Sequence, residues 1–158
     1  MNKQSIITIL LTMLMSMTGA KAFAHDIEAK NADNVTIYYV WINNNTELSV
    51  NYRGSSYSSY SNEYTGNVVI PKSVTYNGNT YPVTSIYGSA FRSCSSLQKL
   101  ELPSTLDSIG NEAFTYTNSL SSVISRIQNP FGISQSVFCL GWDWDYSTGE
   151  EKQIFRKD

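Results

Sequence analysis

Side chains that catalytic and metal sites use are scarce in this sequence. Its 158 residues include one histidine and two cysteines, and Asp, Glu, Lys and Arg together make up only 15% of the chain. Two cysteines without paired histidines do not supply the ligands of a zinc site. The sequence also lacks a glycine-rich phosphate-binding loop. We therefore expect no enzyme, no cofactor and no bound metal.

An excess of basic residues is absent as well. The chain has 11 Lys and Arg against 13 Asp and Glu, so its formal net charge is −2. Nucleic-acid binding depends on clustered positive charge that contacts the phosphates, and we expect no nucleic-acid partner here. Small polar residues and tyrosine are abundant instead, with 23 Ser, 14 Asn, 13 Thr and 11 Tyr. This composition, at this length, is typical of one β-rich extracellular domain.

Residues 1–24 have the pattern of a secretory signal peptide. The basic Lys3 precedes an uncharged apolar stretch, residues 6–17, and small residues follow it. The best match places cleavage before His25, and the second choice places it before Phe23. The apolar stretch is shorter than the roughly 20 residues that span a bilayer. We expect a chain that is secreted or held at the cell surface, with periplasmic retention left open and no membrane span after cleavage.

Two stretches of the chain repeat each other at a spacing of 23 residues. Residues 83–105 have the sequence VTSIYGSAFRSCSSLQKLELPST, and residues 106–128 have the sequence LDSIGNEAFTYTNSLSSVISRIQ. A weaker third copy begins at Ile133. A period of roughly 20 to 29 residues is that of leucine-rich repeats, in which stacked coils bury the apolar side that each coil alone would expose.

Each repeat is expected to hold one strand and one short helical turn. Residues 100–102 alternate apolar and polar side chains, as a strand with one buried face does, and Pro103 ends the strand because proline cannot donate to a sheet. Residues 89–94 predict a short helix or 3₁₀ turn that places the Phe91 ring inside the coil. Upstream, residues 35–52 predict a β-hairpin, which we expect to cap the first coil.

The repeat resembles a known family. Residues 86–104, with Ala90-Phe91, Cys94 and Leu100-Glu101-Leu102-Pro103, resemble the BspA-like (type 5) leucine-rich repeats of secreted and surface bacterial proteins. Residues 64–86 look like the entry module that precedes such repeats. The resemblance implies a solenoid used for adhesion and for binding host or matrix proteins, without shared catalytic residues.

The predicted fold is mainly β with short helical turns, an N-terminal β-hairpin cap being followed by a short leucine-rich-repeat solenoid. We expect four parts along the chain. These are a signal peptide (1–24), a hairpin and loop (25–66), the repeats (67–139) and an irregular acidic and aromatic tail (140–158).

The outward-facing residues of the repeat strands form the expected recognition surface, because the buried leucines alternate with them. The candidates are Gln98, Lys99, Glu101, Ser121 and Ser122. A protein or glycan partner at the cell surface is expected for this face. The alternative is a solvated face on a truncated or structural repeat fragment without a ligand.

Other candidate residues carry weaker chemistry. Cys94 and Cys139 could form a disulfide in an oxidising compartment, although the resemblance implies a small buried residue at position 94. The acidic residues 143–151 only partly match a calcium-binding loop, because Thr148 stands where that loop needs glycine. His25 is expected at a frayed terminus, which cannot hold a catalytic imidazole.

A carbohydrate-binding or carbohydrate-active protein is the remaining alternative. It rests on scattered carboxylates and on aromatic side chains that could stack on sugars. These aromatic residues are Trp41, Trp142, Trp144, Tyr57, Tyr60 and Tyr64.

Overall fold

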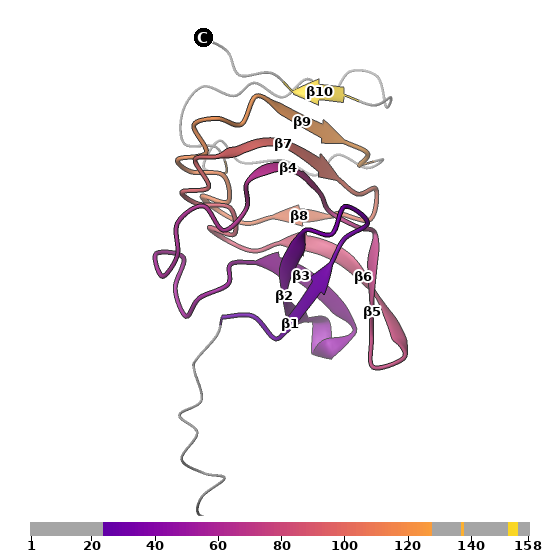
Figure 1. The fold of residues 1–158 in the computed structure, drawn as a ribbon. Helices are drawn as coiled ribbons and strands as arrows, with labels where there is room; N and C mark the ends of the chain where they lie inside the picture. The colour runs from indigo at the N-terminus through magenta and orange to yellow at the C-terminus, as the bar shows by residue number, and fades with distance from the viewer. Residues whose placement is uncertain (1–23, 128–136, 138–151, 155–158) are drawn as a thin grey trace, which may run out of the picture.

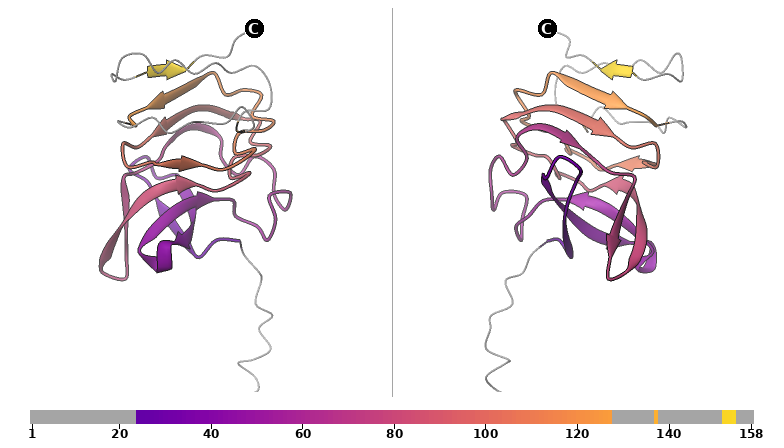
Figure 2. Two further views of the ribbon diagram at one scale, coloured as in Figure 1. Left: turned by 180° about the vertical axis from the view of Figure 1, so that it is seen from behind. Right: turned by 45° about the vertical axis from the view of Figure 1, so that its right-hand side comes forward.

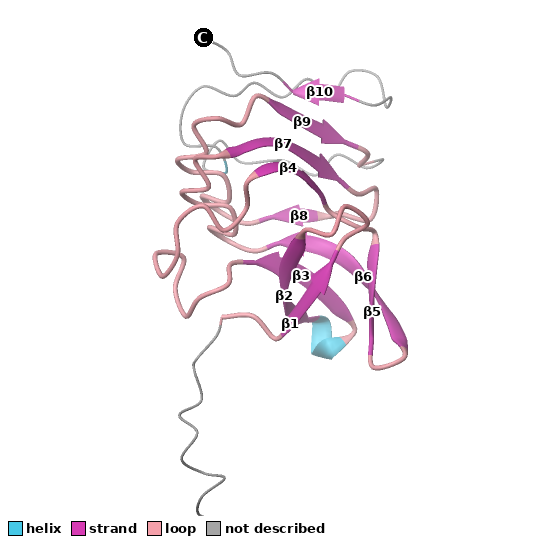
Figure 3. Ribbon diagram, in the orientation of Figure 1, coloured by secondary structure: helices cyan, strands magenta, loops and turns pink. Residues whose placement is uncertain are grey.

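The computed structural model describes residues 24–127, Val137 and residues 152–154. In this part of the chain the protein is mainly β, with one three-residue 3₁₀ segment (Figure 3). The strands are β1 (Ile27–Lys30), β2 (Thr36–Ile42), β3 (Glu47–Asn51), β4 (Gly66–Val69), β5 (Ser73–Tyr76), β6 (Asn79–Ile86), β7 (Leu97–Leu102), β8 (Ser108–Ile109), β9 (Ser122–Ser125) and β10 (Lys152–Ile154). Among the described residues, no helix is long and apolar enough to cross a membrane.

The strands form two sheets (Figure 1). The first has the order β1-β2-β3-β6-β5, with β8 also paired to β6. The second has the order β10-β9-β7-β4. Pairing is parallel from β3 through β6 to β8 and from β4 through β7 to β9. From β4 to β9 the chain therefore passes repeatedly from one sheet to the other, and Figure 2 shows the same arrangement from two further sides.

The predicted helical turn at residues 89–94 is wrong. Alternate N–H groups, those of Ala90, Arg92 and Cys94, donate to the carbonyl three residues earlier, which makes a series of single turns. Ser89 and Ser93 both have a φ of 61°, and a right-handed helix cannot continue through residues in the left-handed region. The intervening N–H groups are not used by these turns and bond to partners outside the segment.

Those partners are carbonyl groups of the following repeat. The N–H groups of Ser89, Phe91 and Ser93 donate to the carbonyl oxygens of Asn111, Ala113 and Thr115 at 3.0, 2.9 and 2.8 Å, in that order. Glu112 and Tyr116, one repeat after the two serines, have φ values of 58° and 60°. The spacing of 23 residues predicted from the sequence is thus present in the backbone.

Aromatic rings form a column through the core, as the sequence predicts for Phe91. The Phe91 ring centroid lies 4.6 Å from that of Tyr64 and 5.3 Å from that of Phe114, and all three side chains are buried. Phe114 N–H donates to Val137 O at 3.0 Å, as Phe91 N–H does to Ala113 O. Val137 thus takes the position of Ala113 in the next copy.

The predicted hairpin is present as the antiparallel pair β2–β3. Its turn is Asn43–Asn45, where all three asparagines have positive φ values between 49° and 65°. Asparagine tolerates the left-handed region better than most residues, which explains why this triplet closes the turn. Ile37, Tyr39, Leu48 and Val50 of the two strands are buried.

Candidate functional site

The residues predicted for the recognition surface lie side by side on β7 and β9. Lys99 pairs in register with Ser122, on adjacent parallel strands. Ser121 N–H donates to Gln98 O at 2.9 Å, and its Oγ lies 3.2 Å from the same oxygen. Leu100 and Leu102 are buried, so the alternating Lys99 and Glu101 project from the other side of the sheet. The structure therefore brings all five candidates together; whether they bind a partner stays a prediction.

Glu101 is the electrostatic centre of this surface. Its Oε1 lies 2.9 Å from Lys99 Nζ, and its Oε2 lies 3.4 Å from Arg126 Nη2. The hydrogen bond from Lys99 and, more weakly, that from Arg126 lower the pKa of the Glu101 carboxyl below its usual value. Because these ion pairs are solvent-exposed they add little stability. They do hold one acidic and two basic groups in a fixed arrangement.

The sequence prediction missed the residues that β4 adds to the same surface. Asn67 and Val69 of β4 pair in register with Lys99 and Glu101. Ile124 of β9, an outward position that the sequence also indicates, pairs with Glu101 on its other side. The sequence does indicate β4, because residues 68–71 resemble residues 100–103 of the repeat. Arg126 follows β9 and corresponds to no residue of these two similar segments, so only the structure identifies it. We call these outward residues of β4, β7 and β9 the strand face.

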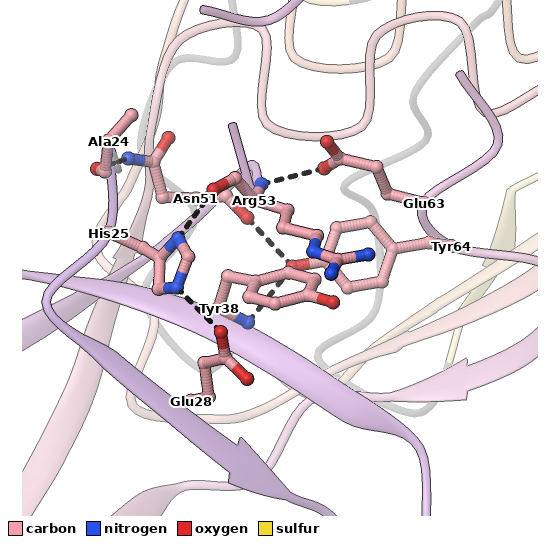
Figure 4. Close-up of polar contacts among 8 residues, drawn as sticks. All are labelled: Ala24, His25, Glu28, Tyr38, Asn51, Arg53, Glu63 and Tyr64. Atoms are coloured by element: carbon pink, nitrogen blue, oxygen red, sulfur yellow. Dashed lines mark hydrogen bonds and ion pairs between the residues drawn. The ribbon is translucent and has the colours of Figure 1, made fainter. Parts of the chain in front are cut away.

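The expectation of a frayed His25 is wrong. Its side chain is only 5% exposed, its Nδ1 lies 2.7 Å from Arg53 O, and its Nε2 lies 3.0 Å from Glu28 Oε1 (Figure 4). The preceding residue explains why the segment is held. Ala24 N–H donates to Gly54 O at 2.8 Å, and Asn51 Nδ2 donates to Ala24 O.

Beside His25, a buried tyrosine joins the aromatic column to the hairpin. Tyr64 OH donates to Asn51 O at 2.7 Å and accepts from Tyr38 N–H at 3.1 Å (Figure 4). Complete burial raises the pKa of Tyr64 well above its ordinary value. Burial also raises the pKa of Glu63, although its hydrogen bond from Arg53 N–H, at 2.8 Å, opposes that shift. The role of the Tyr64 hydroxyl is structural, because it bonds to backbone groups of both β2 and β3.

The remaining candidates are the two cysteines and the partial calcium loop. Cys94 is buried, and burial raises the pKa of its thiol to about 11, so the reactive thiolate is disfavoured. Its proposed partner Cys139 lies outside the described residues, and the disulfide stays a prediction. The partial calcium loop, with Trp142 and Trp144, also lies outside them. Among the residues that are described, no group of three or more His, Cys, Asp or Glu side chains could hold a metal.

The aromatic residues singled out for sugar stacking divide into two groups. Tyr64 is buried, and Trp41 packs edge-on against Tyr81 with ring centroids 4.6 Å apart. Tyr57 and Tyr60, by contrast, are 44% and 43% exposed. Among the described residues of that set, these two are the strongly exposed ones.

Residues 56–140, more than half of the chain, match the family described as the BspA type leucine-rich repeat region, in six copies. None of the curated proteins compared with the chain matches it. Three solved structures are similar to it, all of leucine-rich repeat proteins.

The first of these structures, from Bacteroides ovatus, is 30% identical, covers 58% of this chain and has a TM-score of 0.46. The second, a leucine-rich cell surface protein from Faecalibacterium prausnitzii, is 20% identical, covers 66% and has a TM-score of 0.47. The third, from Bacteroides capillosus, is 27% identical, covers 65% and has a TM-score of 0.47. The chain spans 22%, 25% and 69% of these three proteins, in that order.

Proposed function

Because the chain belongs to the BspA-type leucine-rich repeat family, we propose that it is an exported, non-catalytic module that binds a protein partner through the strand face. A repeat fold of this family supports a binding or structural role. Adhesion at the cell surface is the form of binding that we propose. The proposed export signal is residues 1–24, or residues 1–22 where cleavage falls before Phe23.

The proposed architecture is a short solenoid whose first coil is closed by the hairpin β2–β3. Two parallel series of strands, and the repeated turn backbone between them, support the stacking of coils. A solenoid needs a terminal unit that shields its core, and the buried side chains of the hairpin suit that role. Residues 25–66 would then be the cap and residues 67–139 the coils.

One observation carries the proposal for the strand face. The register of β4, β7 and β9 places Asn67, Lys99 and Ser122 in one row and Val69, Glu101 and Ile124 in the next. Charged, polar and apolar groups thus project together from rigid strands. A surface of this kind can match a complementary partner without first losing the freedom of a flexible loop.

Binding to immobilised extracellular matrix proteins tests this function. The double variant K99S/E101S removes the central ion pair, and K72S removes an exposed lysine that is not on the strand face. We expect at least one matrix protein to bind the native chain, with about tenfold weaker binding by K99S/E101S and unchanged binding by K72S. Absence of binding, or equal binding by all three chains, would contradict the proposal.

A further inference from the structure

Two exposed tyrosines contact one arginine, and a third contacts another arginine, away from the strand face. Every strongly exposed large hydrophobic side chain among the described residues is a tyrosine. The Arg92 guanidinium carbon lies 4.9 Å from the ring centroid of Tyr57 and 5.1 Å from that of Tyr116. Similarly, the Arg53 guanidinium carbon lies 4.8 Å from the ring of Tyr60. We call Tyr57, Tyr60, Arg92 and Tyr116 the tyrosine edge.

The tyrosine edge is built by segments that are distant in sequence. The loop between β3 and β4 supplies Tyr57 and Tyr60, and the turns that precede β7 and β9 supply Arg92 and Tyr116. Figure 1 shows this loop and both turns along one edge of the molecule, and Figure 2 shows the same from behind. The strand face lies on β4, β7 and β9 of the second sheet instead, so the two surfaces are separate.

Arg92 holds the two rings in place. Its side chain is only 18% exposed and forms an ion pair with Glu112, whereas Tyr57 and Tyr116 are 44% and 59% exposed. The guanidinium therefore covers one face of each ring, and much of the remaining ring surface is exposed to solvent. Cation–π contacts of this kind orient aromatic side chains that would otherwise move freely on the surface.

The loop that presents Tyr57 is also fixed. Ser59 N–H donates to Ser56 O at 2.9 Å, and Ser56 N–H donates to Ser59 Oγ at 3.1 Å. A Cβ on Gly54 would lie 2.2 Å from Ser59 Cβ, so the loop closes tightly on glycine. A loop that is ordered before binding loses less conformational entropy when a ligand binds.

Charge and size define the kind of ligand. The ion pair with Glu112 neutralises Arg92, which disfavours a polyanion as the main ligand. No large aliphatic side chain is strongly exposed in the described residues, and four side chains fall far short of the roughly 20 to 30 residues per side of a stable protein interface. Tyr57 and Tyr60 are flanked in the sequence by serines at positions 55, 56, 58, 59 and 61.

We propose that the tyrosine edge binds a neutral glycan. The negative face of an aromatic ring attracts the C–H groups on the flat side of a sugar ring, and nearby hydroxyl groups can bond to its rim. The inference goes beyond the proposed function and does not depend on it, because it uses different residues and a different class of ligand.

Affinity electrophoresis of the full chain in native gels that contain β-glucan, xylan, mannan or starch tests the proposal. The variant Y116S introduces the residue that the chain itself has at the equivalent position 93, where φ is nearly the same, so the backbone should tolerate it. Y57S removes the second ring, and Y57F and Y116F keep both rings without the hydroxyls. Y76S is the matched control, since Tyr76 is exposed on the distant β5–β6 hairpin.

We expect at least one neutral polysaccharide to retard the native chain, with about five- to tenfold weaker binding by Y57S and Y116S. Y57F, Y116F and Y76S should bind within about twofold of the native chain. The proposal is overturned if no neutral polysaccharide retards the chain, if only anionic polysaccharides or matrix proteins bind, or if Y57S and Y116S bind as the native chain does. Loss of matrix binding by K99S/E101S with unchanged glycan binding would separate this site from the strand face.

Discussion

At the scale of single residues, a few buried polar groups tie the N-terminal strands to the rest of the chain. Tyr64 places its ring in the aromatic column and its hydroxyl between the backbones of β2 and β3. His25 bridges Glu28 and the carbonyl of Arg53 in the same region. Such groups contribute mainly because each would be costly to leave unpartnered after burial.

Replacement of Tyr64 by phenylalanine tests this role. Y64F keeps the ring but leaves Asn51 O and Tyr38 N–H without the hydroxyl. We expect the free energy of unfolding to fall by about 1–3 kcal/mol, the usual cost of an unsatisfied buried polar group. Urea denaturation measures it, and Y60F, at an exposed tyrosine, is the control with an expected change under about 0.5 kcal/mol. Equal effects of the two variants would contradict this role.

Glu63 gives the stability a pH dependence of known sign. Burial raises its pKa in the folded protein above the ordinary 4.5. A raised pKa means that the folded state binds the proton more tightly, so this contribution is full below pH 4.5 and is lost as the pH rises through the folded-state value. E63Q cannot ionise, and its stability relative to the native chain should therefore rise between acidic and neutral pH. A pH series of urea titrations checks this, and a falling or constant difference would refute it.

Ala24 bears on where the proposed export signal is removed. Both its N–H and its carbonyl are hydrogen-bonded, to Gly54 O and Asn51 Nδ2. Cleavage before His25 would discard these contacts, whereas cleavage before Phe23 keeps them. We expect the intact mass of the exported protein to correspond to a chain that begins at Phe23. A mass corresponding to a chain that begins at His25 would show that the fold does not require Ala24.

At the scale of elements, close approach between successive repeats depends on glycine. Gly110 donates its N–H to Ile86 O at 2.8 Å, at the point where β8 runs beside the end of β6. A Cβ on Gly110 would lie 2.4 Å from Gly88 N, which is backbone and cannot rotate away. The backbone segments around Gly88 and Gly110 can therefore lie this close together because residue 110 has no side chain.

The variant G110A should accordingly destabilise the protein by about 1–3 kcal/mol, the usual cost of overpacking. G88A is the matched control, because its Cβ would meet Asn111 O at 3.4 Å and needs only a slight adjustment. Thermal unfolding of both variants compares them. A G110A variant that unfolds at the same temperature as G88A would contradict the close approach.

The hairpin and the repeat strand β7 could be predicted from the sequence, whereas β1, β10 and the backbone of the turns before β7 and β9 could not. Alternation of leucine with polar residues in 100–102 follows directly from a sheet with one buried face. The left-handed backbone at Ser89, Ser93, Glu112 and Tyr116 has no such sign, since these residue types rarely adopt it. At Ser89 and Ser93 it is accompanied by hydrogen bonds from their N–H groups to Asn111 O and Thr115 O of the next repeat. The bonds of His25 to Arg53 and of Tyr64 to Tyr38 and Asn51 were likewise not predictable, because these partners lie 28, 26 and 13 residues away in the sequence.

At the scale of the whole molecule, the aromatic column connects the N-terminal strands with the repeats. Tyr38 of β2 packs edge-on against Tyr64, with centroids 6.0 Å apart, and Tyr64 in turn contacts Phe91. The parallel pair β3–β6 continues the same connection in the backbone. Both proposed binding surfaces draw on residues of the repeats, so both depend on this assembly being one rigid unit.

Native-state hydrogen exchange tests that central claim most directly. The amides of β2 and β3 report on the N-terminal strands, and those of β7 report on the repeats. If the assembly is one cooperative unit, the slowest amides of all three strands should exchange with the same free energy of opening, and added denaturant should lower it equally. Amides of β7 that open at a clearly lower free energy, while β2 and β3 remain protected, would contradict the account.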